Sequence, residues 1–72
     1  MSLVIDAQGY SCPQPLMMTM EALAKEKGPL TVLVDGENAR ESIGRAAKKS
    51  GRSFRATTEG RVIRLELGPA VK

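Results

Sequence analysis

The chain carries Leu30-Thr31-Val32-Leu33-Val34-Asp35, a run that is almost all apolar and rich in β-branched side chains. A strand of this kind is typical of the centre of a sheet. Lys27-Gly28-Pro29 comes before it and ends a helix, because Gly is common just past a helix end and Pro cannot continue the helix. Asp35-Gly36-Glu37-Asn38 follows it as a turn. The sequence therefore predicts a central strand with one helix before it and one helix after it in the chain.

The first of these helices is predicted to begin at Pro13 and to stop at Lys27-Gly28-Pro29. Its apolar side chains repeat every three or four residues, which is the spacing of one helix face. Leu16, Met20 and Leu23 mark that face. Met18 lies off it, so we expect Met18 to be exposed and to be the best candidate on this helix for a contact with a partner protein.

The second helix is predicted to begin near Asn38, which is a suitable N-cap with Glu41 three residues later as in a capping box. It should end at Gly51. Its buried face is made mostly of small residues, so the helix should pack closely: Ala39, Ile43, Ala46, Ala47 and Ser50.

Three further strands complete the pattern. Leu3-Val4-Ile5 is a short apolar run that Asp6-Ala7-Gln8-Gly9 closes as a turn. Ser53–Thr58 and Arg61–Leu67 are predicted as a hairpin joined by Glu59-Gly60. In the last strand apolar and polar side chains alternate, so one face of the sheet should be buried and the other wet.

The predicted order is β-α-β-α-β-β over a single domain, residues 1–72. The first three strands are joined by helices and should run parallel, while the final hairpin reverses direction. We therefore expect an α/β protein of the α+β two-layer sandwich type. It should have a four-stranded mixed sheet with both helices on one face.

Cys12 is the only cysteine of the chain, and it stands in Ser11-Cys12-Pro13-Gln14-Pro15. Pro13 suits the first position of a helix, which makes Cys12 the N-cap. A helix N-terminus favours the thiolate, although by only about 0.3–1 kcal/mol at exposed sites. Because Pro13 and Pro15 lack an N–H group, Gln14 is the single local backbone donor to the sulfur. The pattern indicates a reactive thiol, whereas a lone cysteine is otherwise more often a small buried side chain.

The absence of other residues narrows the chemistry of this thiol. The chain has no histidine, which argues against a Cys–His hydrolase, and no second cysteine for dithiol redox chemistry. A structural zinc site has no ligand set here, and we expect neither a metal nor a cofactor. What remains is a sulfur that accepts a group and passes it on, as a persulfide, a mixed disulfide or another thio-adduct.

The cysteine count and the lack of long apolar runs indicate the cell compartment of the protein. A single free thiol is typical of a reducing cytoplasm. No apolar run is long enough to span a membrane, and the N-terminus lacks the pattern of a secretory signal. We expect a soluble, cytoplasmic protein, monomeric and without a membrane partner.

The 72-residue chain has a net charge of +3, but its basic residues gather between Arg40 and Arg64. This basic block has three open interpretations. It is a solvated surface, or a docking surface, through Arg45 and Lys48, for an acidic protein that loads the thiol of Cys12, or a nucleic-acid-binding or regulatory module. Tyr10 and Phe54 are the only aromatic residues, so recognition of single strands by stacking has little support.

The residues around Cys12 resemble a known family. Asp6 is followed three residues later by Gly9, and Gly9 three residues later by Cys12-Pro13-Gln14-Pro15. This spacing is similar to the signature of the TusA/SirA-like sulfur-carrier proteins, and the likeness extends through the second half of the chain. The resemblance implies a small sulfurtransferase-type carrier that holds sulfane sulfur as a persulfide on Cys12. The sulfur would come from a cysteine desulfurase or another donor protein and pass to an acceptor protein.

The resemblance also assigns supporting roles and shows two departures. Pro13 and Pro15 would shape the start of the helix, and Asp6 and Gly9 would form the turn that presents it. Gln8 stands where many members carry Arg, and Ser42 stands where many carry Asp or Asn. Both departures bear on partner choice, and neither changes the nucleophile.

Overall fold

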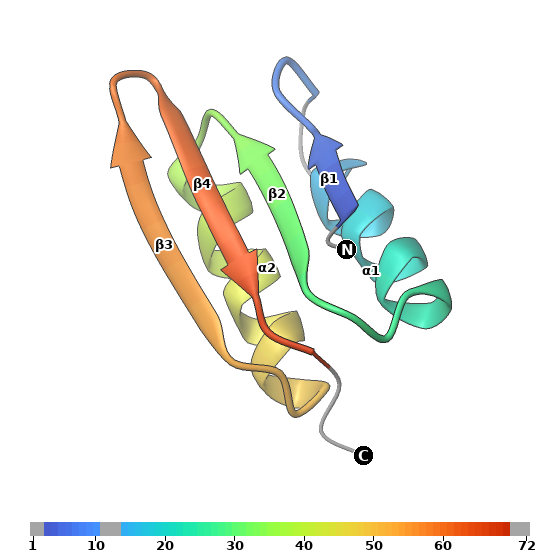
Figure 1. Ribbon diagram of the computed structural model, residues 1–72. Helices are drawn as coiled ribbons and strands as arrows, with labels where there is room; N and C mark the ends of the chain where they lie inside the picture. Colours follow the sequence, from blue (N-terminus) through green and yellow to red (C-terminus); the bar gives the residue numbers. More distant parts are fainter. Residues whose placement is uncertain (1–2, 11–13, 70–72) are drawn as a thin grey trace.

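A computed structural model describes residues 3–10 and 14–69 (Figure 1). The order of the elements is β-α-β-α-β-β, which confirms the predicted fold class. The elements are β1 (Leu3–Asp6), α1 (Gln14–Lys25), β2 (Leu30–Val34), α2 (Glu37–Lys49), β3 (Phe54–Glu59) and β4 (Val62–Leu67).

The four strands form one mixed sheet in the order β1-β2-β4-β3. β1 pairs with β2 in parallel, and β4 pairs antiparallel with both β2 and β3. β1, β2 and β3 therefore point the same way, as the connecting helices predicted, and β4 lies between β2 and β3. Figure 1 shows α1 and α2 together on one face of this sheet.

Buried and more exposed side chains alternate along the two central strands, β2 and β4. This alternation separates the core from the solvent-facing side of the sheet. Every second side chain of β2 and β4 is buried under the helices, and the side chains between them are half-buried or exposed. The buried apolar core consists of Ala7, Leu30, Val32, Val34, Ile43, Ala47, Ile63, Leu65 and Leu67. The predicted division into one buried and one wet face is confirmed.

The buried face of α1 is centred on Pro15 and Thr19. Met18 packs against the core beside them, whereas Met17 and Met20 are 61% and 54% exposed. The expectation that Met18 is exposed is therefore wrong. The cause is Thr19, whose hydroxyl donates to the Pro15 carbonyl across 2.9 Å. A polar residue satisfied inside its own helix can be buried, and hydropathy spacing alone does not reveal it.

The capping box predicted for α2 is wrong. Gly36 is the N-cap, with extended φ −146° and ψ 148° and no side-chain hydrogen bond to the first turn. The helix begins at Glu37, so Asn38 and Glu41 already lie inside it. Glu37 accepts a hydrogen bond from Arg40 Nε at 2.7 Å. An acidic residue at this end also suits the helix dipole.

The turn of the hairpin is displaced by one residue from the prediction. Glu59 pairs with Val62, so the turn consists of Gly60 and Arg61 rather than Glu59 and Gly60. Gly60 has φ +66°. The first central residue of a tight hairpin turn takes this left-handed conformation, which glycine adopts without strain.

Candidate functional site

The loop that leads from β1 toward Cys12 begins with a turn closed by a carboxylate. Asp6, the last residue of β1, accepts hydrogen bonds at Oδ1 from the backbone N–H and the Nε2 atom of Gln8, each at 3.1 Å. A carboxylate that binds the backbone two residues on forms an Asx-turn. Gln8 is thereby held against the Asp6 carboxylate.

The same loop is fastened to the neighbouring strand. Ala7 is fully buried, and its N–H donates to the Leu33 carbonyl at 2.8 Å. Gly9 has φ +84°, and its N–H donates to Asp35 Oδ2 at 2.9 Å. Because β1 and β2 are parallel, their carboxyl ends meet at one edge of the sheet. The residues just before Tyr10 are therefore fixed by β2.

The role of Asp35 was not predicted from the sequence, where this residue stands only as part of a turn. A usable signal was present: Asp6 and Asp35 each come at the end of one of two adjacent parallel strands. That placement brings both carboxylates to the same edge, where they can accept hydrogen bonds from the loop.

The other flank of Cys12 is the first turn of α1. Gln14 is exposed, and Pro15 is buried on the side of the helix that faces the core. Cys12 and Pro13 lie outside the described residues, so their roles as N-cap and first helical residue stay predictions. Tyr10, two residues before Cys12, is 51% exposed. The described flanks thus include a sheet-bound loop before Cys12 and a core-bound helical turn after it.

The basic block is smaller at the surface than its sequence indicated. Arg52 is only 5% exposed and donates to the carbonyls of Glu26 and Gly28 near the end of α1. Arg40 is paired with Glu37, and Arg64 with Glu59. Arg52 therefore lies in the interior and belongs to none of the three surfaces that the sequence left open for the basic block.

The exposed cations of α2 are Arg45, Lys48 and Lys49. Within residues 3–10 and 14–69, no ion pair holds any of the three. Arg45 lies between two hollows, one on each side of α2, while Lys48 and Lys49 each line only one of them.

The hollow between the two helices is here named the α1–α2 groove. It has a volume of about 370 Å³. It is lined by Leu16 and Met20 of α1 and by Ser42, Arg45, Ala46, Lys49 and Ser50 along α2. Lys49, which the sequence did not single out, belongs to this groove.

Lys48 lines a smaller cleft between α2 and β3, of about 180 Å³. Arg45 contributes to this cleft as well, so the structure does bring the predicted pair Arg45 and Lys48 together there. Gly44 and Phe54 form its inner wall. Lys48 and Lys49 thus carry the same charge but line two different hollows beside one helix.

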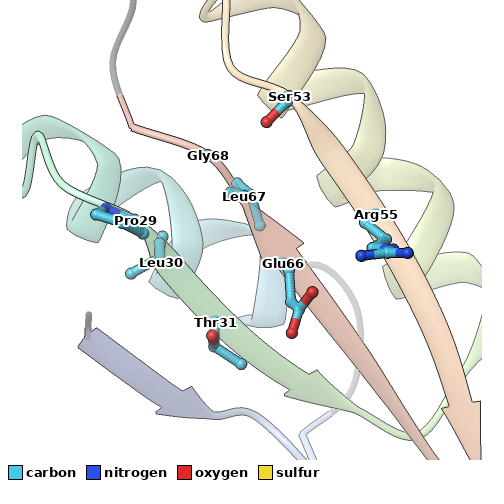
Figure 2. Close-up of a pocket in the computed structure, with 8 residues that line it drawn as sticks. All are labelled: Pro29, Leu30, Thr31, Ser53, Arg55, Glu66, Leu67 and Gly68. Atoms are coloured by element: carbon cyan, nitrogen blue, oxygen red, sulfur yellow. The ribbon is translucent and has the colours of Figure 1, made fainter. Parts of the chain in front are cut away.

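A third hollow lies at the far end of the sheet from the loop before Cys12 (Figure 2). Its volume is about 390 Å³, and it lies where β2 begins and β4 ends. Arg55 and Glu66, which are register partners on β3 and β4, line it with opposite charges. The Asp35 carboxylate is beyond the other end of β2, so this hollow shares no residue with the flanks of Cys12.

Two negative findings concern the described part of the chain only. Residues 3–10 and 14–69 contain no group of three or more metal-ligating side chains close enough to hold an ion. Among these same residues, neither helix has the length and apolar character needed to cross a membrane.

Comparison with known proteins supports the reading of these residues. A family model described as sulfurtransferase TusA matches residues 3–67. The crystal structure of a SirA-like protein from Desulfitobacterium hafniense superposes with a TM-score of 0.85 and 31% sequence identity. This match covers 92% of the present chain and 95% of the other. No curated protein sequence matches the chain.

Proposed function

This chain belongs to the TusA sulfurtransferase family, and on that premise we propose that it holds sulfane sulfur as a persulfide on Cys12. A member of this family is a sulfurtransferase of the sulfur-carrier kind. The finer proposal is a relay in which one protein loads Cys12 and a second protein unloads it. The donor would be a cysteine desulfurase or another persulfide-bearing protein of a reducing cytoplasm.

The chemistry of loading balances without an oxidant or reductant. The Cys12 thiolate attacks the outer sulfur of a donor persulfide, R–S–SH, and a new S–S bond forms on Cys12. The S–S bond of the donor breaks, and its inner sulfur leaves as a thiolate, R–S⁻. The outer sulfur keeps its proton and its oxidation state. Unloading repeats the step with Cys12 as the leaving thiolate and the acceptor as the nucleophile.

One observation carries the proposal: in this family member, the segments before and after the cysteine are both fastened to the fold. Gly9 is bound to Asp35 on one side, and Pro15 is buried on the other. A carrier needs a thiol held at the surface of a firm scaffold, because the partner proteins supply the acid and base groups. The arrangement supports that role and requires no second catalytic residue in this chain.

The experiment that tests this function is an intact-mass measurement under non-reducing conditions. The protein is incubated with a cysteine desulfurase and free cysteine, and separately with thiosulfate or with polysulfide. We expect one added sulfur atom on the wild type and none on Cys12→Ala. Equal addition to both proteins, or no addition from any source, would contradict the proposal.

The nucleic-acid alternative is weakened by the placement of the basic residues. Arg52 is buried, and Arg40 and Arg64 are already paired with glutamates. The cations left on α2 do not alternate with aromatic side chains that could stack on bases. Binding to nucleic acid would show as an affinity that falls steeply with salt and is indifferent to Cys12.

A further inference from the structure

We infer that the α1–α2 groove is the docking site for an acidic segment of a partner protein, a segment that also carries an apolar side chain. The inference rests on the proposed function, since the partner is a protein that gives sulfur to Cys12 or takes it away. It goes further by naming where that protein binds and what chemistry its binding segment has.

The floor of the groove is apolar and reachable from solvent. Leu16 and Met20 come from α1 and Ala46 from α2. Met20 is 54% exposed, although it lies on the helix α1 that packs against α2. Leu16 and Ala46 are half-buried beside it, and an exposed apolar side chain that shares a hollow with such neighbours is typical of a contact surface. Methionine adapts its shape to different partners, which suits a carrier that must meet both a donor and an acceptor.

The rim of the groove on α2 is positively charged. Arg45 and Lys49 line it, and within the described residues no ion pair neutralises either one. Ser42 and Ser50 are the remaining polar groups, and none of the lining residues is acidic. Complementary charge steers association and fixes orientation. The matching partner segment therefore carries carboxylates around its apolar side chain.

The groove also begins in the right place for sulfur transfer. Leu16 lies in the first turn of α1, four residues after Cys12 in the chain. A protein that reaches the sulfur must contact this end of α1. A segment of that protein continuing along α1 meets Leu16 first and Met20 one turn later, and it then lies beside the cations of α2.

A protein segment fits these features better than a nucleic acid does. A phosphate backbone is charged and makes no favourable contact with the apolar floor of the groove. Base stacking needs aromatic side chains. Tyr10 and Phe54, the aromatic residues of the chain, line no part of the groove. The charge on α2 alone would attract both classes, so the floor is the feature that decides between them.

The experiment measures binding of the full chain to a fluorescent synthetic peptide in which two leucines are flanked by two glutamates on each side. We expect the double variant Arg45→Glu/Lys49→Glu to weaken binding by about tenfold or more, because the two cations are close to the bound carboxylates. Met20→Gln should weaken binding without any change in charge. The affinity of the wild type should fall as salt is raised.

The matched control is Lys27→Glu/Lys48→Glu, which changes the net charge by the same amount. Lys48 is the sequence neighbour of Lys49 but faces the cleft toward β3, and Lys27 follows α1 at its far end. We expect this control to weaken binding by no more than about twofold, through long-range electrostatics alone. Equal losses in both double variants would overturn the inference.

Two further arms separate the remaining outcomes. A peptide of six glutamates and a short single-stranded RNA should each bind at least about tenfold more weakly than the leucine-containing peptide, because neither fills the apolar floor. Equal or tighter binding of either would overturn the inference in favour of a general polyanion surface. Loading of Cys12 by polysulfide is measured on the same variants by intact mass. If the wild type gains no sulfur from polysulfide, from thiosulfate or from a cysteine desulfurase, the carrier function is refuted. Normal loading without groove-dependent binding refutes only the docking site.

Discussion

The backbone N–H of Gly9 donates a hydrogen bond to Asp35 Oδ2 across 2.9 Å, and this bond ties the loop before Cys12 to the residue that follows β2. The two residues are 26 positions apart in the chain. They meet because β1 and β2 run parallel and end at the same edge of the sheet. The placement of the loop therefore depends on the pairing of the sheet as well as on its own sequence.

Removing the Asp35 carboxylate should loosen this loop. We expect Asp35→Ala to lower the free energy of unfolding by about 1 kcal/mol, the usual net value of one hydrogen bond. Asp35→Asn keeps an acceptor oxygen and should lose less. Urea denaturation measures the stability, and amide hydrogen exchange at Gly9 reports the bond itself. Unchanged exchange at Gly9 in Asp35→Ala would show that the bond does not hold the loop.

Supplying a side-chain cap to α2 should stabilise the protein. Gly36 has the extended backbone of an N-cap, and a Cβ atom added there would meet no atom within 4 Å. We expect Gly36→Ser to raise the free energy of unfolding by roughly 0.5 kcal/mol, since serine can accept an N–H bond of the first turn. Gly36→Ala is the control without an acceptor. If alanine stabilises as much as serine in thermal unfolding, capping is not the cause.

Arg52 should be worth far more to stability than an exposed arginine. Its guanidinium is buried and donates to the carbonyls of Glu26 and Gly28. Arg52→Met would leave these acceptors without a donor, and we expect a loss of about 3 kcal/mol. Arg61→Met, at the exposed hairpin turn, is the matched control and should change stability by less than about 0.5 kcal/mol. Chemical denaturation of both variants measures the two losses in the free energy of unfolding. If Arg52→Met does not fold, Arg52→Lys is measured as the milder substitution.

Gly44 and Phe54 should be energetically coupled. A Cβ atom at Gly44 would lie 3.0 Å from Phe54 Cε2, closer than packed carbons normally approach. We expect Gly44→Ala to destabilise the protein by about 1 kcal/mol through overpacking. In a Phe54→Leu background the same change should be neutral or stabilising, because alanine is the better helix former. A double-mutant cycle by urea denaturation measures the coupling, and additive effects would contradict it.

The architecture could be predicted from the sequence because its signals are local. The apolar run at Leu30–Val34, the glycine and proline stops, and the alternation in Val62–Leu67 each depend on near neighbours in the chain. Helical crossovers between strands then fix the parallel directions. The position of β4 between β2 and β3 is a tertiary pairing, and no short-range pattern marks it.

Several side-chain roles could not be predicted because they depend on distant partners. Arg52 appears in sequence as one more cation, and only the fold brings it to the carbonyls at the end of α1. Thr19 is polar yet buried, which shifted the predicted face of α1 and misplaced Met18. Lys48 and Lys49 are adjacent in the chain, and their different surroundings follow from helix geometry and from which neighbour packs on each side of α2.

The central position of β4 has a consequence for how the protein is made. Among the strands of residues 3–10 and 14–69, β3 pairs only with β4, and β4 follows β3 in the chain. A growing chain that ends before Val62 therefore has β1 and β2 but cannot join β3 to them. Because β4 comes after β3 in the chain and joins it to β2, the ribosome must pass Leu67 before α2 can cover a sheet of four strands.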